Sequence, residues 1–230
     1  MIKSMNPRSG AGDDSTLIES VTGKLREAII DGVFPPGTRL VIADLVKRYS
    51  VSPMPVREAL RRLEGEGMID SVPNKGATVR RLDSRMIADI YEIRGALEVM
   101  VVSGLVNKLT LADLDVLENI QRELEQAVAD DDQRGLMEAN SRFHAYLGDV
   151  GHNREVAKVL GYGGGLLTAL RNRYGISKSR REAVVAEHRA LLKALRRGDG
   201  FEAANIARMH VIAARNDLLT LLDKDDQTQI

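Results

Sequence analysis

The sequence predicts a mainly α-helical protein, with an N-terminal winged helix-turn-helix (a small β wing) followed by an all-α bundle of about six helices. Two observations predict this division. Strand-like runs occur only before about residue 83, and long helical periodicities continue from there to Leu222. No proline follows Pro73, so the second part lacks the strongest helix breaker. We expect a flexible tail at residues 1–15, domains at residues 16–80 and 83–222, and a second flexible tail at residues 223–230.

The first domain begins with a predicted helix over about residues 17–31. Apolar residues recur there at helical spacing, and Gly32 follows as a stop signal. Pro36 and Gly37 suit the central positions of a turn, and a short extended piece comes after them. This order predicts a helix, a turn and a short strand.

Two short helices joined by a tight turn come next. Residues 42–49 have an amphipathic pattern, and only Ser50 and Val51 separate them from a helix that starts at Ser52 and Pro53. Serine is a favoured N-cap residue, and proline is tolerated at the first helical position. The arrangement predicts a helix-turn-helix.

The second of these helices has two different faces. Arg57 and Arg61 lie four residues apart on one face, with Met54 near its N-terminal end. Arginines in this arrangement suit phosphate oxygens and guanine edges. The alternative is an ordinary solvated face, on which these arginines exchange ion pairs with Glu58 and Glu64. The apolar stripe of the helix consists of Val56, Ala59, Leu60 and Leu63.

Two short strand-like runs close the first domain. They flank Asn74, Lys75 and Gly76, which form a turn signal with a cation at its tip. A β-hairpin with Lys75 at the tip is typical of a wing.

Together these motifs carry a family resemblance. Pro-Pro-Gly-Thr-Arg-Leu, Val-Ser-x-x-Pro-Val-Arg-Glu-Ala-Leu-Arg-Arg-Leu, Gly-Met-Ile and Asn-Lys-Gly-Ala follow one another over about residues 15–80. In these motifs the chain resembles the winged helix-turn-helix of the GntR family of bacterial transcription regulators, in its FadR-like branch. The resemblance implies DNA binding, with the wing in the minor groove. The implied contact residues are Arg39, Ser52, Arg57, Arg61 and Gly76, to which the helix and wing patterns add Met54 and Lys75.

The chain departs from the family at Pro53, where a basic residue is usual. A base or phosphate contact from this position is missing, so we expect a different preferred operator. Met54, Arg57 and Arg61 then carry more of the discrimination. We also expect a homodimer on a palindromic operator, because two recognition helices then enter successive major grooves about 34 Å apart.

Composition excludes several kinds of site and permits DNA binding. The 230 residues contain no cysteine, which removes disulfides, thiolate metal sites and cysteine nucleophiles. Residues 1–82 hold 13 Lys and Arg against 10 Asp and Glu, and the rest of the chain holds 20 against 23, so the positive excess lies in the first domain. No apolar run approaches the roughly 18 residues of a membrane span, and the start lacks a signal-peptide core. We expect a cytoplasmic bacterial protein with no membrane partner.

Histidines are the most informative residues of the second domain. His144, His188 and His210 lie well inside predicted helices, and Asn140 shares a helical face with His144. Imidazoles that converge from separate helices can hold a metal in a bundle core. A lone helical histidine is more often a hydrogen-bonded structural residue, so both interpretations are open. The predicted helices cover about residues 83–107, 110–130, 132–150, 153–174 with an interruption, 178–197 and 199–222.

The second domain resembles the FCD ligand-binding domain that accompanies this type of winged helix. In that family one helix supplies an acidic residue and a histidine four later, and two further helices supply one histidine each. Asn140, His144, His188 and His210 match those places, which implies a divalent metal such as Zn²⁺, Ni²⁺ or Mn²⁺. Asn140 stands where Asp is commonest. A neutral amide oxygen is a poorer ligand, so we expect a more positive site that holds its metal less tightly.

A small acid is the effector that the resemblance implies. Arg94 occupies the place of an arginine that faces the ligand cavity in this family, and it is our candidate for holding a carboxylic or sugar acid. The alternative for Arg94 is a pair with Glu98, four residues later on the same helix. The glycine-rich run at residues 161–165 predicts a helix break and not a phosphate cradle, because no strand precedes it. Further candidates for the acid are Arg142, Arg171, Arg173 and Tyr174.

These expectations combine into a DNA-binding transcriptional regulator, a repressor and not an enzyme, controlled by a small organic acid at the metal site. If the acid prefers the DNA-incompetent state by ~2–3 kcal/mol, operator affinity falls roughly 30- to 150-fold. One alternative is a metal-dependent hydrolase or isomerase domain fused to a DNA-binding module, with Glu187 as base. Another is an effector-independent DNA-binding protein whose histidines are structural.

Overall fold

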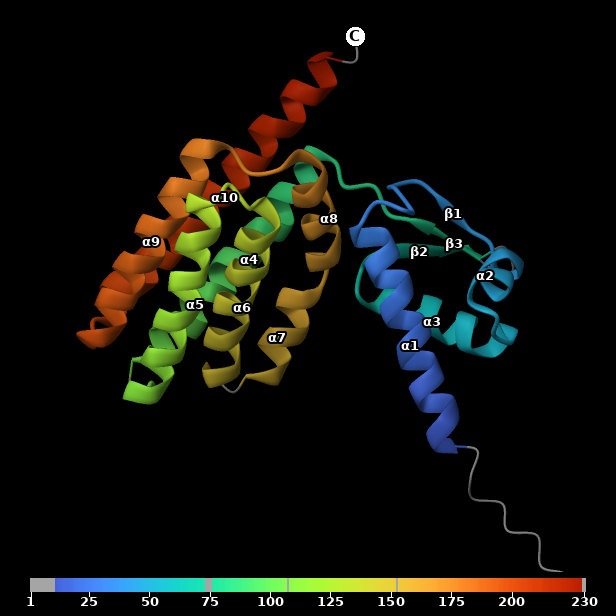
Figure 1. Ribbon diagram of the computed structural model, residues 1–230, viewed down its shortest axis with the longest axis horizontal. Coiled ribbons are helices and arrows are strands. Elements are labelled where there is room, and N and C mark those ends of the chain that lie inside the picture. Colours follow the sequence, from blue (N-terminus) through green and yellow to red (C-terminus); the bar gives the residue numbers. More distant parts are fainter. Residues whose placement is uncertain (1–10, 73–75, 107, 152, 229–230) are drawn as a thin grey trace, which may run out of the picture. The chain divides into compact units, whose positions relative to one another are not determined.

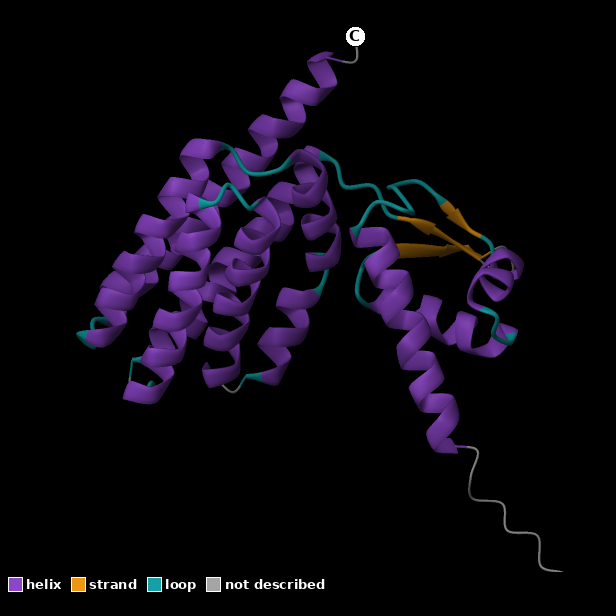
Figure 2. Ribbon diagram, in the orientation of Figure 1, coloured by secondary structure: helices purple, strands orange, loops and turns teal. Residues whose placement is uncertain are grey.

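The computed structural model describes residues 11–72, 76–106, 108–151 and 153–228. These residues form helices and one small antiparallel sheet (Figure 1, Figure 2), and the predicted fold class is confirmed. They divide into two compact units between Arg81 and Leu82, and Tyr162–Ala169 is grouped with the first unit. The elements are α1 Ala11–Ile30, β1 Arg39–Leu40, α2 Ile42–Tyr49, α3 Pro53–Gly65, β2 Ile69–Val72, β3 Gly76–Val79, α4 Ser84–Leu105, α5 Leu111–Ala129, α6 Gln133–Gly151, α7 Arg154–Gly161, α8 Gly164–Tyr174, α9 Lys178–Arg196 and α10 Gly200–Thr228.

Apolar residues of α1 and α3 form the core of the first unit. The two helices pack against each other, and the apolar stripe predicted for α3 is confirmed by its burial. Burying one aliphatic side chain of this size contributes about 1.5–3 kcal/mol. The buried residues are Val21, Leu25 and Ile29 of α1 and Val56, Ala59, Leu60 and Leu63 of α3.

The predicted tight turn between α2 and α3 is confirmed. Ser50 has left-handed backbone geometry, with φ 53° and ψ 45°, and this ends α2. Ser52 is extended at the N-cap of α3, and Pro53 is the first helical residue. The hydroxyl of Ser52 makes no capping hydrogen bond, unlike serine at most such positions. The turn geometry, and not a side-chain cap, therefore sets where α3 begins.

The three strands form one sheet in the order β1-β3-β2. β1 pairs with β3 through Arg39 and Leu40. Gly76 begins β3 with a φ of 95°, and a Cβ atom there would lie 2.2 Å from the carbonyl oxygen of Leu40. Only glycine fits such a close approach of two backbones. The predicted wing tip, including Lys75, lies outside the described residues.

Both terminal helices extend further than expected. α1 begins at Ala11, so residues 11–15 are helical where a flexible tail was expected. α10 continues to Thr228, into the second expected tail, because no glycine or proline interrupts it after Leu222.

The second unit is a bundle whose helices pack by their apolar faces. α4 packs along α10, α10 also along α9, and α5 along α6 and α9, as Figure 1 shows. α5 begins with a capping box, in which the Thr110 hydroxyl accepts from the Asp113 N–H and the Asp113 carboxylate accepts from the Thr110 N–H. The core between the helices includes Leu105, Leu117, Phe143 and Leu195.

The glycine-rich run breaks a helix, as predicted. α7 ends at Gly161 and α8 begins at Gly164, with Gly163 between them at a φ of 70°. A positive φ of this size favours glycine. Within the described residues, seven helices, α4–α10, therefore follow the sheet along the chain, where the sequence suggested about six.

Candidate DNA-reading helix and candidate metal centre

The exposed face of α3 carries the side chains that the sequence selected for DNA. Met54 is 52% exposed, and Arg57 is exposed and has no ion pair among the described residues. Arg61 is 75% exposed, but its Nη2 lies 2.7 Å from Oε1 of Glu58 and its Nε lies 3.0 Å from Oε2. The alternative of surface ion pairs therefore holds for Arg61 and not for Arg57. An exposed pair of this kind is weak and does not prevent Arg61 from contacting phosphate.

The other predicted DNA contacts have different surroundings. Arg39 on β1 and Ser52 before α3 are both exposed. The close approach of Gly76 to the backbone of Leu40 explains why glycine occupies this position, so the residue is needed for strand pairing in the sheet. Lys75 lies outside the described residues.

Three histidines from three helices converge in the second unit. His144 of α6, His188 of α9 and His210 of α10 each offer a ligand atom, and these atoms all lie within 4.8 Å of one another. The ring centroids are 5.0–5.3 Å apart. His188 also stacks on Phe143 at 4.1 Å, which holds its ring in place. The convergence predicted from the sequence is therefore present.

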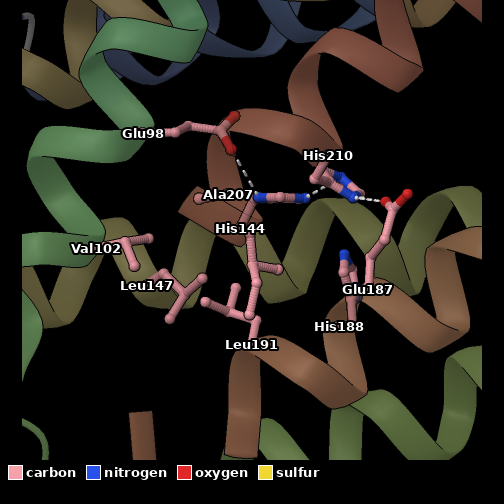
Figure 3. Close-up of a pocket in the computed structure, with 10 residues that line it drawn as sticks. Glu98, Val102, His144, Leu147, Glu187, His188, Leu191, Ala207 and His210 are labelled. Atoms are coloured by element: carbon pink, nitrogen blue, oxygen red, sulfur yellow. Dashed lines mark hydrogen bonds and ion pairs between the residues drawn. The ribbon is translucent and has the colours of Figure 1, made fainter. Parts of the chain in front are cut away.

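Each imidazole has an oxygen atom next to its Nδ1. His144 Nδ1 lies 3.3 Å from Oε2 of Glu98, and His210 Nδ1 lies 2.6 Å from Oε2 of Glu187. Dashed lines mark both contacts in Figure 3. His188 Nδ1 lies 3.2 Å from an oxygen of a neutral side chain, Oε1 of Gln121. An Nδ1–H that donates to oxygen leaves Nε2 with its lone pair. All three rings are therefore set up to offer Nε2 to a common centre.

The Nε2 atoms meet the requirements of a metal site. Nε2 of His144 lies 3.2 Å from Nε2 of His210. Two nitrogens bound at 2.0–2.1 Å to a tetrahedral ion stand about 3.3 Å apart, so this spacing fits. Nε2 of His188 and Oδ1 of Asn140 are buried and have no hydrogen-bond partner. Buried polar atoms without partners are uncommon, and a cation held by the three histidines would satisfy Nε2 of His188.

Burial and hydrogen bonding act in opposite directions on the two acids at this centre. Burial tends to raise the pKa of Glu98, but the neighbouring charges, above all His144, lower its pKa to about 2. Burial likewise tends to raise the pKa of Glu187, and the hydrogen bonds from His210 and Arg180 outweigh burial and lower its pKa to about 2. Both acids are therefore carboxylates that accept hydrogen bonds.

Burial lowers the pKa of both fully enclosed histidines, His188 and His210. For His210 the hydrogen bond to Glu187 acts in the opposite direction. A neutral imidazole is the form that binds metals. The interior of the bundle thus favours the ligand form of these two side chains.

A small, partly open cavity adjoins the histidines. Arg94, the predicted effector contact, does not itself line this cavity and is paired with Glu98 at 3.3 Å, which is the alternative that the sequence left open. Arg142 is exposed and pairs with Glu123. The cavity is lined by Glu98, Val102, His144, Leu147, Glu187, His188, Leu191, Ile206, Ala207 and His210.

The remaining candidates for the acid have structural partners. Arg171 is buried, and its Nη1 lies 2.5 Å from Oδ2 of Asp217 on α10. Arg173 lies over the ring of Tyr174, at 5.1 Å from its centroid. None of the three lines the cavity, so the structure does not bring them to the histidines.

Sequence reasoning missed several residues around the histidines. Glu98 entered only as a partner for Arg94, and Glu187 only as a base in the enzyme alternative. The sequence does not single out Arg180 or Gln121, because neither lies near a histidine in the chain. A signal for Glu187 was available, since it directly precedes His188, but its contact is with His210.

Two family models match the chain. The FCD domain matches residues 89–213, and the model for bacterial regulatory proteins of the gntR family matches residues 17–79. The chain belongs to the GntR family of bacterial regulatory proteins. This GntR-family protein has a helix-turn-helix DNA-binding domain before an FCD domain, as the motifs predicted. Its place in the FadR-like branch stays a prediction.

Relatives and solved structures agree with this assignment. The chain is 28% identical over 194 residues to the HTH-type transcriptional regulator YdhC of Bacillus subtilis (strain 168), covering 84% of this chain and 85% of YdhC. It is 40% identical over 86 residues to the gluconate operon transcriptional repressor of the same bacterium, covering 37% and 35% of the two chains. The structure of E. coli McbR/YncC has the same fold, with a TM-score of 0.74 and 24% identity over 90% of this chain and 98% of that chain.

The GntR-family protein is a DNA-binding transcriptional regulator and not an enzyme, because its families and relatives are regulators. The alternative of a hydrolase or isomerase is therefore set aside. Among the described residues, none of the helices combines the length and apolar character that a bilayer span needs.

Proposed function

We propose that this regulator is a homodimeric repressor whose affinity for a palindromic operator depends on a divalent metal and a small carboxylic or sugar acid. It acts where operator DNA lies, in the bacterial cytoplasm. A named repressor among the relatives supports repression over activation. Two copies are needed because one α3 helix contacts too few bases for a specific site.

The DNA side of the proposal rests on the exposed face of α3. Arg57 is the cation of this face without an ion pair among the described residues, and Met54 lies beside it at the helix start. An arginine that bonds a guanine edge discriminates between bases by about 1–3 kcal/mol. Arg39, Ser52 and Arg61 are proposed to contact the backbone, with Lys75 and Gly76 at the wing.

The metal side rests on one observation. Three histidines direct Nδ1 to oxygen acceptors, and Nε2 of His144 and His210 stand 3.2 Å apart. We propose these Nε2 atoms and Oδ1 of Asn140 as the ligands of Zn²⁺, Ni²⁺ or Mn²⁺. When bound, the ion offers a Lewis-acidic position for a carboxylate oxygen.

The acid is proposed to bind in the cavity beside these ligands. Arg94 is partly exposed and bonded to Glu98, so it can exchange that partner for the carboxylate of an effector. Neutral Asn140 in place of an acidic ligand leaves the metal site more positive, which favours an anionic effector. Effector binding then shifts the FCD domain towards a packing that binds DNA less well.

Operator footprinting on the DNA upstream of the protein's own gene tests this function. Protection is measured with the metal-loaded protein, with a chelator, and with a panel of C3 to C6 carboxylic and sugar acids. We expect a protected palindrome that responds to the chelator and to one class of acid. Arg57→Ala serves as the DNA-binding control, because it leaves the metal site intact.

A different result would contradict each part of the proposal. Protection that no acid changes would support the effector-independent alternative. Protection that the chelator leaves unchanged, in protein shown by elemental analysis to have lost its metal, would remove the metal from the regulatory step. Protection by a single copy of the protein would contradict the dimer.

A further inference from the structure

Outside the proposed ligands, three oxygen-bearing side chains surround the histidines. They are Glu98 on α4, Gln121 on α5 and Glu187 on α9, and each faces the Nδ1 of a different imidazole. We propose that Glu98 and Glu187 are positioning residues that fix the protonated nitrogen and the ring orientation of His144 and His210, and so strengthen metal binding. The inference rests on the proposed metal site.

Glu98 is well placed for this role because it is held from both sides. Its side chain is buried, with Oε2 3.3 Å from His144 Nδ1 and Oε1 3.3 Å from Nη2 of Arg94. A buried carboxylate with these two partners accepts hydrogen bonds and has none to give. His144 must therefore carry its proton on Nδ1, and its Nε2 is free for an ion.

Glu187 holds His210 in the same way. Oε2 of Glu187 lies 2.6 Å from His210 Nδ1, and Oε1 accepts from Nη1 of Arg180 at 2.6 Å. Arg180 is itself buried, and its Nη2 donates to the backbone carbonyl of His210 at 3.1 Å. The same Nη2 lies 3.2 Å from His210 Nδ1, so the acid and the arginine both contact this side of the ring, and the shorter contact is with the acid.

The third ring has a neutral partner. Gln121 directs its amide nitrogen to Oε1 of Glu125 at 2.9 Å and to the carbonyl of Val185 at 3.3 Å. These bonds leave its oxygen to face His188 Nδ1. Each of the three rings therefore has an oxygen acceptor next to its Nδ1, and two of the three acceptors are charged.

Charged acceptors raise the basicity of an imidazole ligand, and losing such a partner costs about 10- to 100-fold in metal affinity. The effect should matter more here than at a site with an acidic ligand. Asn140, the fourth proposed ligand, is neutral, so the imidazoles supply most of the bonding.

The test measures Zn²⁺ affinity by chelator competition and the visible spectrum of the Co²⁺-substituted full-length protein. Glu98→Gln and Glu187→Gln are each expected to weaken Zn²⁺ binding about 10- to 100-fold and to shift the Co²⁺ bands. The matched control is Glu155→Gln, which removes an exposed acid that pairs with Lys158 and does not line the cavity. The control should leave both readouts unchanged.

Folding is checked by thermal denaturation of the metal-free variants. Glu98→Asp and Glu187→Asp keep the charge but withdraw it from the ring by one methylene, and they give the same readouts if an amide variant does not fold. Asp variants that bind Zn²⁺ as tightly as the control protein would overturn the inference.

The outcomes separate this inference from the proposed function. A wild-type protein that binds no divalent metal overturns the proposed metal site, and the inference falls with it. A wild-type protein that binds Zn²⁺ while both Gln variants match the control overturns the inference alone. X-ray absorption showing one ligand fewer in a Gln variant would make that glutamate a direct ligand and would also overturn the positioning role.

Discussion

Nε2 of His144 lies 3.2 Å from Nε2 of His210, although 66 positions separate the two residues in the chain. Each ring has a carboxylate at its other nitrogen, so both lone pairs point at the same space. Two lone pairs so close repel each other unless a proton or a metal cation lies between them. The stability of the FCD domain should therefore depend on the proposed metal.

Metal removal is the first prediction. Chelation should lower the melting temperature of the full-length protein. A metal present at about 100 times its dissociation constant adds about 2.7 kcal/mol to the free energy of unfolding, and chelation removes this contribution. His210→Ala should abolish the difference between the chelated and metal-loaded protein. The control is His152→Ala, which changes the histidine outside the proposed ligand set. A chelator response that persists in His210→Ala would contradict the assignment.

Arg57→Ala should weaken operator binding by about 1–3 kcal/mol and relax base preference at one position of each half-site. The reason is the missing ion pair of Arg57 among the described residues, which leaves its guanidinium available. Lys24→Ala, an exposed cation on α1, is the matched control. Fluorescence anisotropy with operator and scrambled DNA measures the affinity of each variant for the two DNAs. An equal loss of affinity for both DNAs would reassign Arg57 to a phosphate contact.

Glu58→Gln should strengthen operator binding. The change removes the partner that holds Arg61 at 2.7 Å and also removes a negative charge from the DNA face. Arg61 is exposed and Glu58 is partly exposed, so the melting temperature should hardly change. The anisotropy experiment, repeated at several salt concentrations, should give a steeper salt dependence. Unchanged affinity would show that Arg61 does not contact DNA.

Gly76→Ala should destabilise the DNA-binding domain by about 1–3 kcal/mol. The added Cβ would lie 2.2 Å from the Leu40 carbonyl oxygen, at a φ of 95°. Gly23→Ala is the control, because no atom lies within 4 Å of its added Cβ, and alanine should stabilise α1 there by up to about 1 kcal/mol. Urea denaturation followed by circular dichroism distinguishes the two signs.

Asn140→Asp should tighten metal binding by about tenfold or more, because it replaces a neutral oxygen with a carboxylate at a position whose Oδ1 is buried and lacks a hydrogen-bond partner. Chelator competition measures the gain. The added charge should also weaken the response to an anionic acid. Affinity that stays at the wild-type level would exclude Asn140 from the ligand set.

Local patterns were enough to predict most of the secondary structure. α2 occupies Ile42–Tyr49 as expected, and the predicted starts of α5 and α9 match Leu111 and Lys178. These features depend on apolar spacing and on caps such as Thr110, which act over one or two turns. The helix ends at Ala11 and Thr228 were missed because a polar segment can continue a helix that packing elsewhere has already stabilised.

By itself, the sequence determined the helix-turn-helix with its arginine face and identified the histidines by their family positions. Only the tertiary structure decided which atoms meet. It paired Arg94 with Glu98 and turned His210 towards Glu187, and it brought Gly76 against Leu40. Such contacts depend on how whole helices and strands are rotated and spaced against one another. Burial of apolar faces sets that packing across the whole unit, and residues near in sequence do not reveal it.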